Sequence, residues 1–139
     1  MDRLPSFDAL WNNYPNGGPD EVKATIGGHV NATWIDNTCV IRLCRALNYS
    51  GYRVHPDSGL HCVSGKDGYQ YGYRVSEFRP WMEHHFGPPT SVGSGRGIIC
   101  FALPGHVGYT GHFDLWDGGT CRHGDYSAQA ASRVLWPCT

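Results

Sequence analysis

Residues 37–51, NTCVIRLCRALNYSG, contain the strongest helix signal in this chain of 139 residues. Apolar side chains recur there at i, i+3, i+4 and i+7, which predicts a helix from about residue 38 to 48 that packs on the core; they are Val40, Leu43, Cys44 and Leu47. Asn37 or Thr38 is suited to cap this helix, and Gly51 stands just beyond its last turn. Cys39 is therefore expected in the first turn.

The position of Cys39 suits a nucleophile. A thiol attacks as thiolate, and the N-terminus of a helix favours that anion through its unpaired N–H groups and its dipole. The same N–H groups can serve in an oxyanion hole. Cys44 lies on the apolar stripe instead, so we interpret it as a buried structural residue.

A base for Cys39 is expected from a strand. In GHFDLWDGG, residues 111–119, polar and apolar side chains alternate, so His112 and Asp114 face away from the apolar set. We predict His112 as base and Asp125 as the group that orients it. Asp114 shares the face of His112 but is expected one residue pair further along the strand, and Asp117 is interpreted as a turn residue. The competing histidines are His29, His61, His84, His85 and His106.

The remaining sequence predicts an α+β protein with a small antiparallel sheet. We expect a short N-terminal helix capped by Ser6, a helical turn at 20–26, one hairpin within 52–73, a helix at 76–86 capped by Ser76, and strands at 97–103 and 133–136. Pro80 is expected to be tolerated only in the first turn of its helix. A chain of this length fits a single domain, residues 1–139.

Composition excludes several classes of protein. Hydrophobic residues make up 40% of the chain and charged residues 17%, as in ordinary folded domains. A net charge of -1 argues against a nucleic-acid partner. We expect no membrane span, because no apolar stretch approaches about 20 residues, and the start, MDRLPSFDALW, lacks a secretory core. Six cysteines leave the compartment open.

Four segments together resemble the type VI secretion amidase effectors of family 4, which are similar to NlpC-type papain-like peptidases. The segments are SFDALWNNYP, NTCVIRLCRALNYSG, GHFDLWDG and the closing segment with its cysteine. The resemblance implies Cys39 as nucleophile, His112 as base and Asp125, or secondly Asp117, as third residue, with no metal or organic cofactor. It also implies cleavage of the D-glutamyl-meso-diaminopimelate amide bond in peptidoglycan stem peptides.

The resemblance further implies delivery without a signal peptide by a type VI secretion apparatus into the periplasm of a target bacterium, and a cognate periplasmic immunity protein. In that oxidising space a bridge between Cys121 and Cys138 is a hypothesis based on their positions, and Cys62 with Cys100 is a second candidate pair. Trp34 and Asp36, just upstream of Cys39, are expected to line the cleft.

Two rival functions come from other classes. The cysteines and the eight histidines could stabilise a zinc-binding module, although no C-x-x-C knuckle is present. Five tryptophans and eight tyrosines could instead form the sugar platform of a non-catalytic wall-binding domain. Metal analysis discriminates the first rival, and substitution of Cys39 the second.

Overall fold

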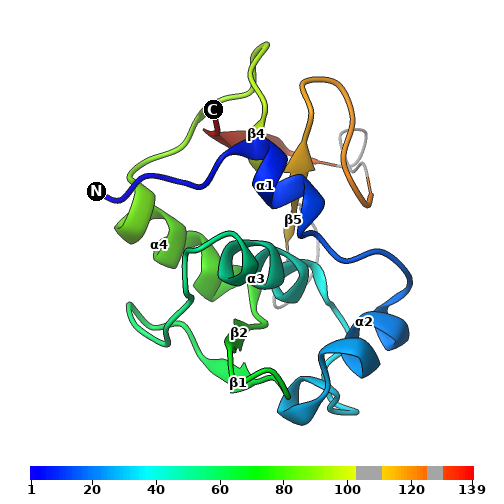
Figure 1. Ribbon diagram of the computed structural model, residues 1–139. Helices are drawn as coiled ribbons and strands as arrows, with labels where there is room; N and C mark the ends of the chain where they lie inside the picture. Colours follow the sequence, from blue (N-terminus) through cyan, green and yellow to red (C-terminus); the bar gives the residue numbers. More distant parts are fainter. Residues whose placement is uncertain (103–110, 125–129) are drawn as a thin grey trace.

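The computed structural model has an α+β fold, as expected (Figure 1). It describes residues 1–102, 111–124 and 130–139. The helices are α1 Phe7–Asn12, α2 Pro19–Ile26, the 3-10 turn η1 Gly28–Val30, α3 Cys39–Tyr49 and α4 Val75–Phe86. The strands are β1 Cys62–Ser64, β2 Gln70–Gly72, β3 Thr90–Ser91, β4 Gly97–Ala102, β5 Gly111–Trp116 and β6 Ser132–Pro137.

Helix α3 lies at the centre of the molecule, between the larger sheet and the β1–β2 hairpin (Figure 1). It contacts α1, α4, β2 and β5. The stripe predicted from the sequence is fully buried, and its members are Val40, Leu43, Cys44 and Leu47. Burial of this apolar stripe on several sides fixes the helix rigidly, so its first residue has a defined position relative to β5.

The larger sheet is antiparallel, with strand order β3-β6-β4-β5. Strand β5 is therefore an edge strand, paired only with β4 among the described strands. In that pairing His112 lies opposite Phe101, and Asp114 lies opposite Ile99. An edge position leaves one side of β5 open to other parts of the chain, which is where a helix terminus can approach.

The two faces of the sheet contribute to different apolar clusters. Phe113 and Leu115 pack with the helices in the main core, whereas Trp116 belongs to a smaller cluster on the opposite face. The smaller cluster also contains Ile99, Phe101 and Leu135. The predicted alternation along 111–116 is thus confirmed, and it puts His112 and Asp114 on the face that bears Trp116.

Helix α4 differs from the prediction in two respects. It begins at Val75 with Arg74 in the capping position, so Ser76 lies inside the helix and the predicted Ser76 cap is wrong. Pro80 lies beyond the first turn, so the restriction placed on it is also wrong. Proline at this position removes the hydrogen bond to the carbonyl of Ser76, which is on an exposed residue that water can reach.

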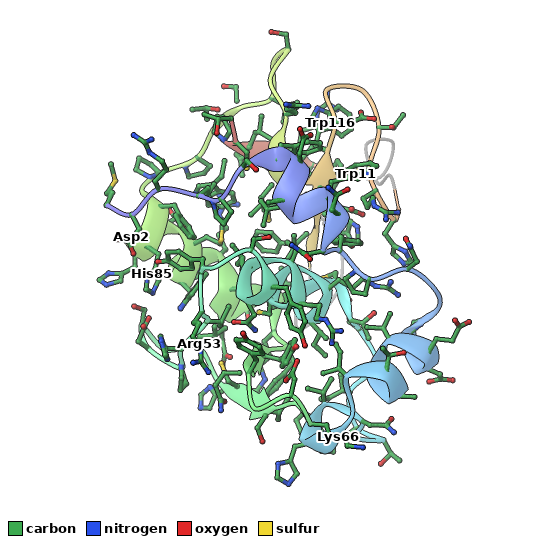
Figure 2. The ribbon with its side chains drawn as sticks, in the orientation of Figure 1. Asp2, Trp11, Arg53, Lys66, His85 and Trp116 are labelled. Atoms are coloured by element: carbon green, nitrogen blue, oxygen red, sulfur yellow. The ribbon has the colours of Figure 1, made fainter. Side chains whose placement is uncertain are left out.

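The N-terminal segment is attached to the end of α4, and Figure 2 shows Asp2 beside His85 there. The Asp2 amide donates to the His85 carbonyl at 2.7 Å, and Asp2 also bonds to the Tyr52 hydroxyl. The His85 ring bonds to Tyr52 at 2.8 Å and to Asp57 at 2.7 Å. These contacts fix the segment that leads into α1. There Ser6 caps the helix as predicted, since its hydroxyl oxygen accepts a hydrogen bond from the Ala9 amide at 3.2 Å. Within the described ranges, no helix has the length and apolarity needed to cross a membrane.

Candidate active site

Cys39 is the first residue of α3, as predicted, and its side chain is buried with 4% exposure. Its backbone N–H donates to the Asn37 side-chain oxygen at 3.0 Å. Thr38 occupies the capping position, but its hydroxyl accepts a bond from Arg42 Nε at 3.1 Å instead of capping the helix. Both predicted cap residues therefore hold this terminus, and they do so through different groups.

Arg42 fixes the start of α3 from inside the protein, which the sequence did not predict. The residue is fully buried. Besides Thr38, its guanidinium donates to the carbonyl oxygens of Pro15 at 3.2 Å and Gly17 at 2.8 Å. Arg42 thus joins the α1–α2 connection to the turn that carries Cys39. Its hydrogen bonds take the place of the water that the guanidinium loses on burial.

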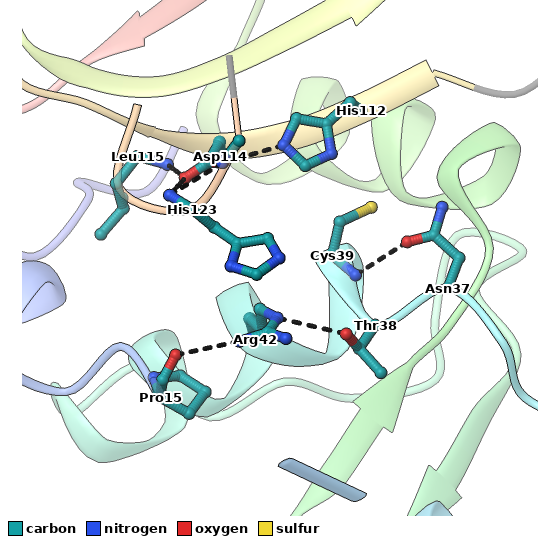
Figure 3. Close-up of polar contacts among 10 residues, drawn as sticks. Pro15, Asn37, Thr38, Cys39, Arg42, His112, Asp114, Leu115 and His123 are labelled. Atoms are coloured by element: carbon teal, nitrogen blue, oxygen red, sulfur yellow. Dashed lines mark hydrogen bonds and ion pairs between the residues drawn. The ribbon is translucent and has the colours of Figure 1, made fainter. Parts of the chain in front are cut away.

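His112 reaches Cys39 from β5. Figure 3 shows the imidazole turned toward the Cys39 side chain, with the Asp114 carboxylate on its other side. His112 Nε2 lies 2.8 Å from Asp114 Oδ2, and the residue is 5% exposed. Burial lowers the pKa of His112, but its hydrogen bonds to Asp114 and Cys39 and its electrostatic interactions with these two residues outweigh the effect of burial and raise the pKa to about 9. This environment favours the imidazolium.

Asp114 is fully buried and is held by backbone donors. Its carboxylate accepts from the amides of Leu115 at 2.7 Å, His123 at 3.1 Å and Gly124 at 2.9 Å. Asp114, expected on the face of His112 but one residue pair further along the strand, lies within hydrogen-bonding distance of the imidazole. Side chains at i and i+2 share a strand face, and this proximity was the signal that could have identified the pair.

Asp125 and Asp117 are the other two carboxylates predicted as candidates to orient His112. Asp125 lies outside the described residues, so its role stays a prediction. Asp117 accepts from the amides of Gly119 at 2.9 Å and Thr120 at 2.7 Å, and stabilises its own turn. Those donors lower the pKa of Asp117. It behaves as the turn residue expected from Asp117-Gly118.

His123 is a residue near the site that the sequence did not single out as functional. Its ring lies near Arg42 (Figure 3), while its backbone amide binds Asp114. Burial and the nearby Arg42 charge lower the pKa of His123. The site therefore combines a histidine that favours the charged form, His112, with one that favours the neutral form.

The competing histidines named from the sequence have their contacts elsewhere where the structure describes them. His29 contacts Ser64 at 3.1 Å, His61 contacts Glu77 at 2.8 Å, and His85 binds Asp57. His84 packs on the His85 ring, and His106 lies outside the described residues. Among the predicted histidines that the structure describes, His112 is therefore the one that lies next to Cys39.

The structure contains no disulfide bond among the described cysteines. Cys44 is buried as expected, and burial raises its pKa. The proposed bridge between Cys121 and Cys138 is not formed, because Cys138 packs in the main core and Cys121 in the cluster on the opposite sheet face. Cys62 and Cys100 are not bridged either. In the part of the chain that the structure describes, no group of three or more His, Cys, Asp or Glu side chains is placed to hold a metal ion.

A cavity of about 280 Å³ is lined in part by the residues that immediately precede Cys39 in the chain. It contains the two predicted cleft residues, Trp34 and Asp36, and Asn37 also lines it. Tyr73 and Arg74, which precede α4, form its other side. Since the Asn37 side chain also binds the Cys39 amide, the cavity lies near the first residue of α3.

The chain is similar to proteins of known structure. A family model described as type VI secretion system amidase effector protein 4 (Tae4) matches residues 35–136. The type VI effector Tae4 from Enterobacter cloacae superposes with a TM-score of 0.88 at 27% identity over 100% of both chains. The Tae4-Tai4 effector-immunity complex from Salmonella Typhimurium gives a TM-score of 0.86 at 26% identity, covering 99% of this chain and 100% of that chain. No curated protein sequence matches. The expected papain-like, NlpC-type arrangement is confirmed.

Proposed function

This chain belongs to the family of type VI secretion system amidase effector 4, and from that premise we propose that it hydrolyses the D-glutamyl-meso-diaminopimelate amide bond of peptidoglycan stem peptides. The family description makes the protein an amidase effector. The bond and the residues that cut it are the proposal. It rests chiefly on one observation, the His112 imidazole held between Cys39 and Asp114.

The proposed chemistry uses two protein side chains. The Cys39 sulfur attacks the D-glutamyl side-chain carbonyl, and the C–N bond breaks as His112 transfers its proton to the departing amine of diaminopimelate. A thioester remains on Cys39. Water, deprotonated by His112, then attacks this thioester, releases the glutamyl carboxylate and returns the proton to the Cys39–His112 pair.

Asp114 is proposed as the residue that orients His112. It accepts a hydrogen bond from Nε2, which leaves the other ring nitrogen for Cys39. Three backbone amides fix the carboxylate, so it keeps the ring in one rotamer and stabilises its positive charge. Asp125 remains the alternative from the sequence.

We also propose the biological setting. The protein is delivered by a type VI secretion apparatus and acts in the periplasm of a target bacterium, where the stem peptides are. The producing cell requires a periplasmic immunity protein that covers the cleft. The solved Tae4-Tai4 complexes from Enterobacter cloacae and Salmonella Typhimurium support such a partner.

Digestion of purified peptidoglycan tests the function. Mass spectrometry of the released fragments is expected to reveal new D-glutamyl carboxyl and diaminopimelyl amino ends with the wild type and none with Cys39→Ala. Cys62→Ala is the matched control, because Cys62 is a partly buried thiol on β1 and should retain activity. Cleavage by Cys39→Ala would exclude this nucleophile, and a different set of fragments would exclude this bond.

A further inference from the structure

The cavity before Cys39 has an exposed aromatic wall. Trp34 is 59% exposed, although its ring is one of the largest apolar side chains in the protein. Its ring meets Tyr73 edge-to-face with centroids 5.0 Å apart. The Arg74 guanidinium lies over the same Tyr73 ring at 5.2 Å. The Tyr73 ring is therefore covered by Trp34 and Arg74, whereas the indole of Trp34 remains open to solvent.

The segment that carries Trp34 is held in place from behind. Lys23 on α2 is 7% exposed, and its ammonium donates to the Ile35 carbonyl at 2.6 Å. On the other side of the segment, Asn37 is bonded to the Cys39 amide. The buried Lys23 ammonium binds the backbone carbonyl of Ile35 and so fixes the residue between Trp34 and Asp36. The aromatic wall is therefore preorganised for a ligand.

The polar groups around the indole are of mixed type. Asp36 provides a carboxylate, Asn37 an amide and Arg74 a guanidinium. Arg74 also bonds to Glu77 at 3.1 Å, so the charges near the cavity offer no excess of positive field for a free carboxylate. A ring with apolar C–H faces and several hydroxyl or acetamido groups uses an open indole and mixed hydrogen-bonding groups together.

We propose that this cavity is a sugar subsite that takes an amino-sugar ring of the glycan strand. The inference rests on the proposed function, because it assumes that the substrate is a stem peptide attached to a glycan. In that substrate, L-alanine and D-glutamate separate the sugar from the scissile bond, a reach on the order of 10 Å. The cavity lies within that reach of Cys39, since Asn37 lines the cavity and also accepts a hydrogen bond from the Cys39 amide.

Two soluble substrates test the subsite. One is the N-acetylated stem tetrapeptide, and the other is the same peptide attached to its disaccharide. The wild type is expected to cleave the disaccharide form with a kcat/KM higher by roughly fivefold to tenfold. Trp34→Ala should reduce this ratio to about one, because the loss in kcat/KM falls on the disaccharide substrate. Tyr49→Ala is the matched control, because Tyr49 is an exposed aromatic residue at the other end of α3.

Each outcome of this comparison is decisive. Equal kcat/KM values for the two substrates with the wild type would overturn the sugar subsite. An equal loss on both substrates in Trp34→Ala would overturn it too, and would assign the indole to the peptide. Binding of the disaccharide alone to Cys39→Ala, lost in the double variant with Trp34→Ala, would support it. Failure of the proposed function looks different, because the wild type would then cleave neither substrate.

Discussion

His112 and Asp114 are bound to each other at 2.8 Å although only one residue separates them on β5. Both side chains leave the same face of one strand, and the carboxylate is fully buried. The orientation of the imidazole is therefore set within a rigid element, and Cys39 is brought to it by α3. This arrangement leads to predictions about pH, positioning and stability.

Stability is expected to fall as the pH rises through the alkaline range. The pKa of His112 is raised from 6.5 to about 9 in the folded protein, so the extra stability is fully present below about pH 6.5 and is lost between about 6.5 and 9. The loss should be of order 3 kcal/mol at most. Urea unfolding across this range measures it. His112→Gln should give a flatter curve, and an equal slope would contradict the assignment.

Asp114→Asn is expected to shift the alkaline limb of the kcat/KM profile to lower pH. The substitution removes the negative charge that stabilises the imidazolium, so His112 loses its proton earlier. A change confined to stability would leave the limb unmoved, and thermal unfolding of the variant separates the two effects. Asp125→Asn is the comparison. If it moved the limb and Asp114→Asn did not, the orienting role would belong to Asp125.

Arg42→Met is expected to destabilise the protein by about 3 kcal/mol. The substitution keeps an unbranched apolar stem but leaves Thr38, Pro15 and Gly17 without the buried donor that they share. Arg45→Met is the control, since Arg45 is partly exposed and its nearest acid, Asp67, is 3.7 Å away. That change should alter the free energy of unfolding by less than about 1 kcal/mol. Similar losses in the two variants would contradict a special role for Arg42.

Gly28→Ala is expected to destabilise more than Gly51→Ala. Both glycines have a positive φ, +61° and +92°, which strains any other residue by about 1 kcal/mol. A methyl group at Gly28 would also lie 2.7 Å from the Lys66 amide nitrogen, whereas nothing lies within 4 Å at Gly51. Denaturant titration of the two variants isolates the backbone clash. Equal changes would show that the η1 turn can move away from Lys66.

The sequence by itself determined the elements that depend on neighbours along the chain. The period of residues 40–47 and the break at Gly51 gave helix α3 with Cys39 at its start. The alternation of residues 111–116 placed His112 and Asp114 on one face. Such features follow from local backbone geometry, because a helix repeats every 3.6 residues and a strand every two.

Only the tertiary structure decided which of the described histidines approaches Cys39 and which described carboxylate binds that histidine. The burial of Arg42 and the meeting of Trp34 with Tyr73 belong to the same class, since their partners come from separate segments. Local patterns carry no information about which segments pack together. That choice is made by burial of the whole apolar surface at once, which fixed α3 against the edge strand β5.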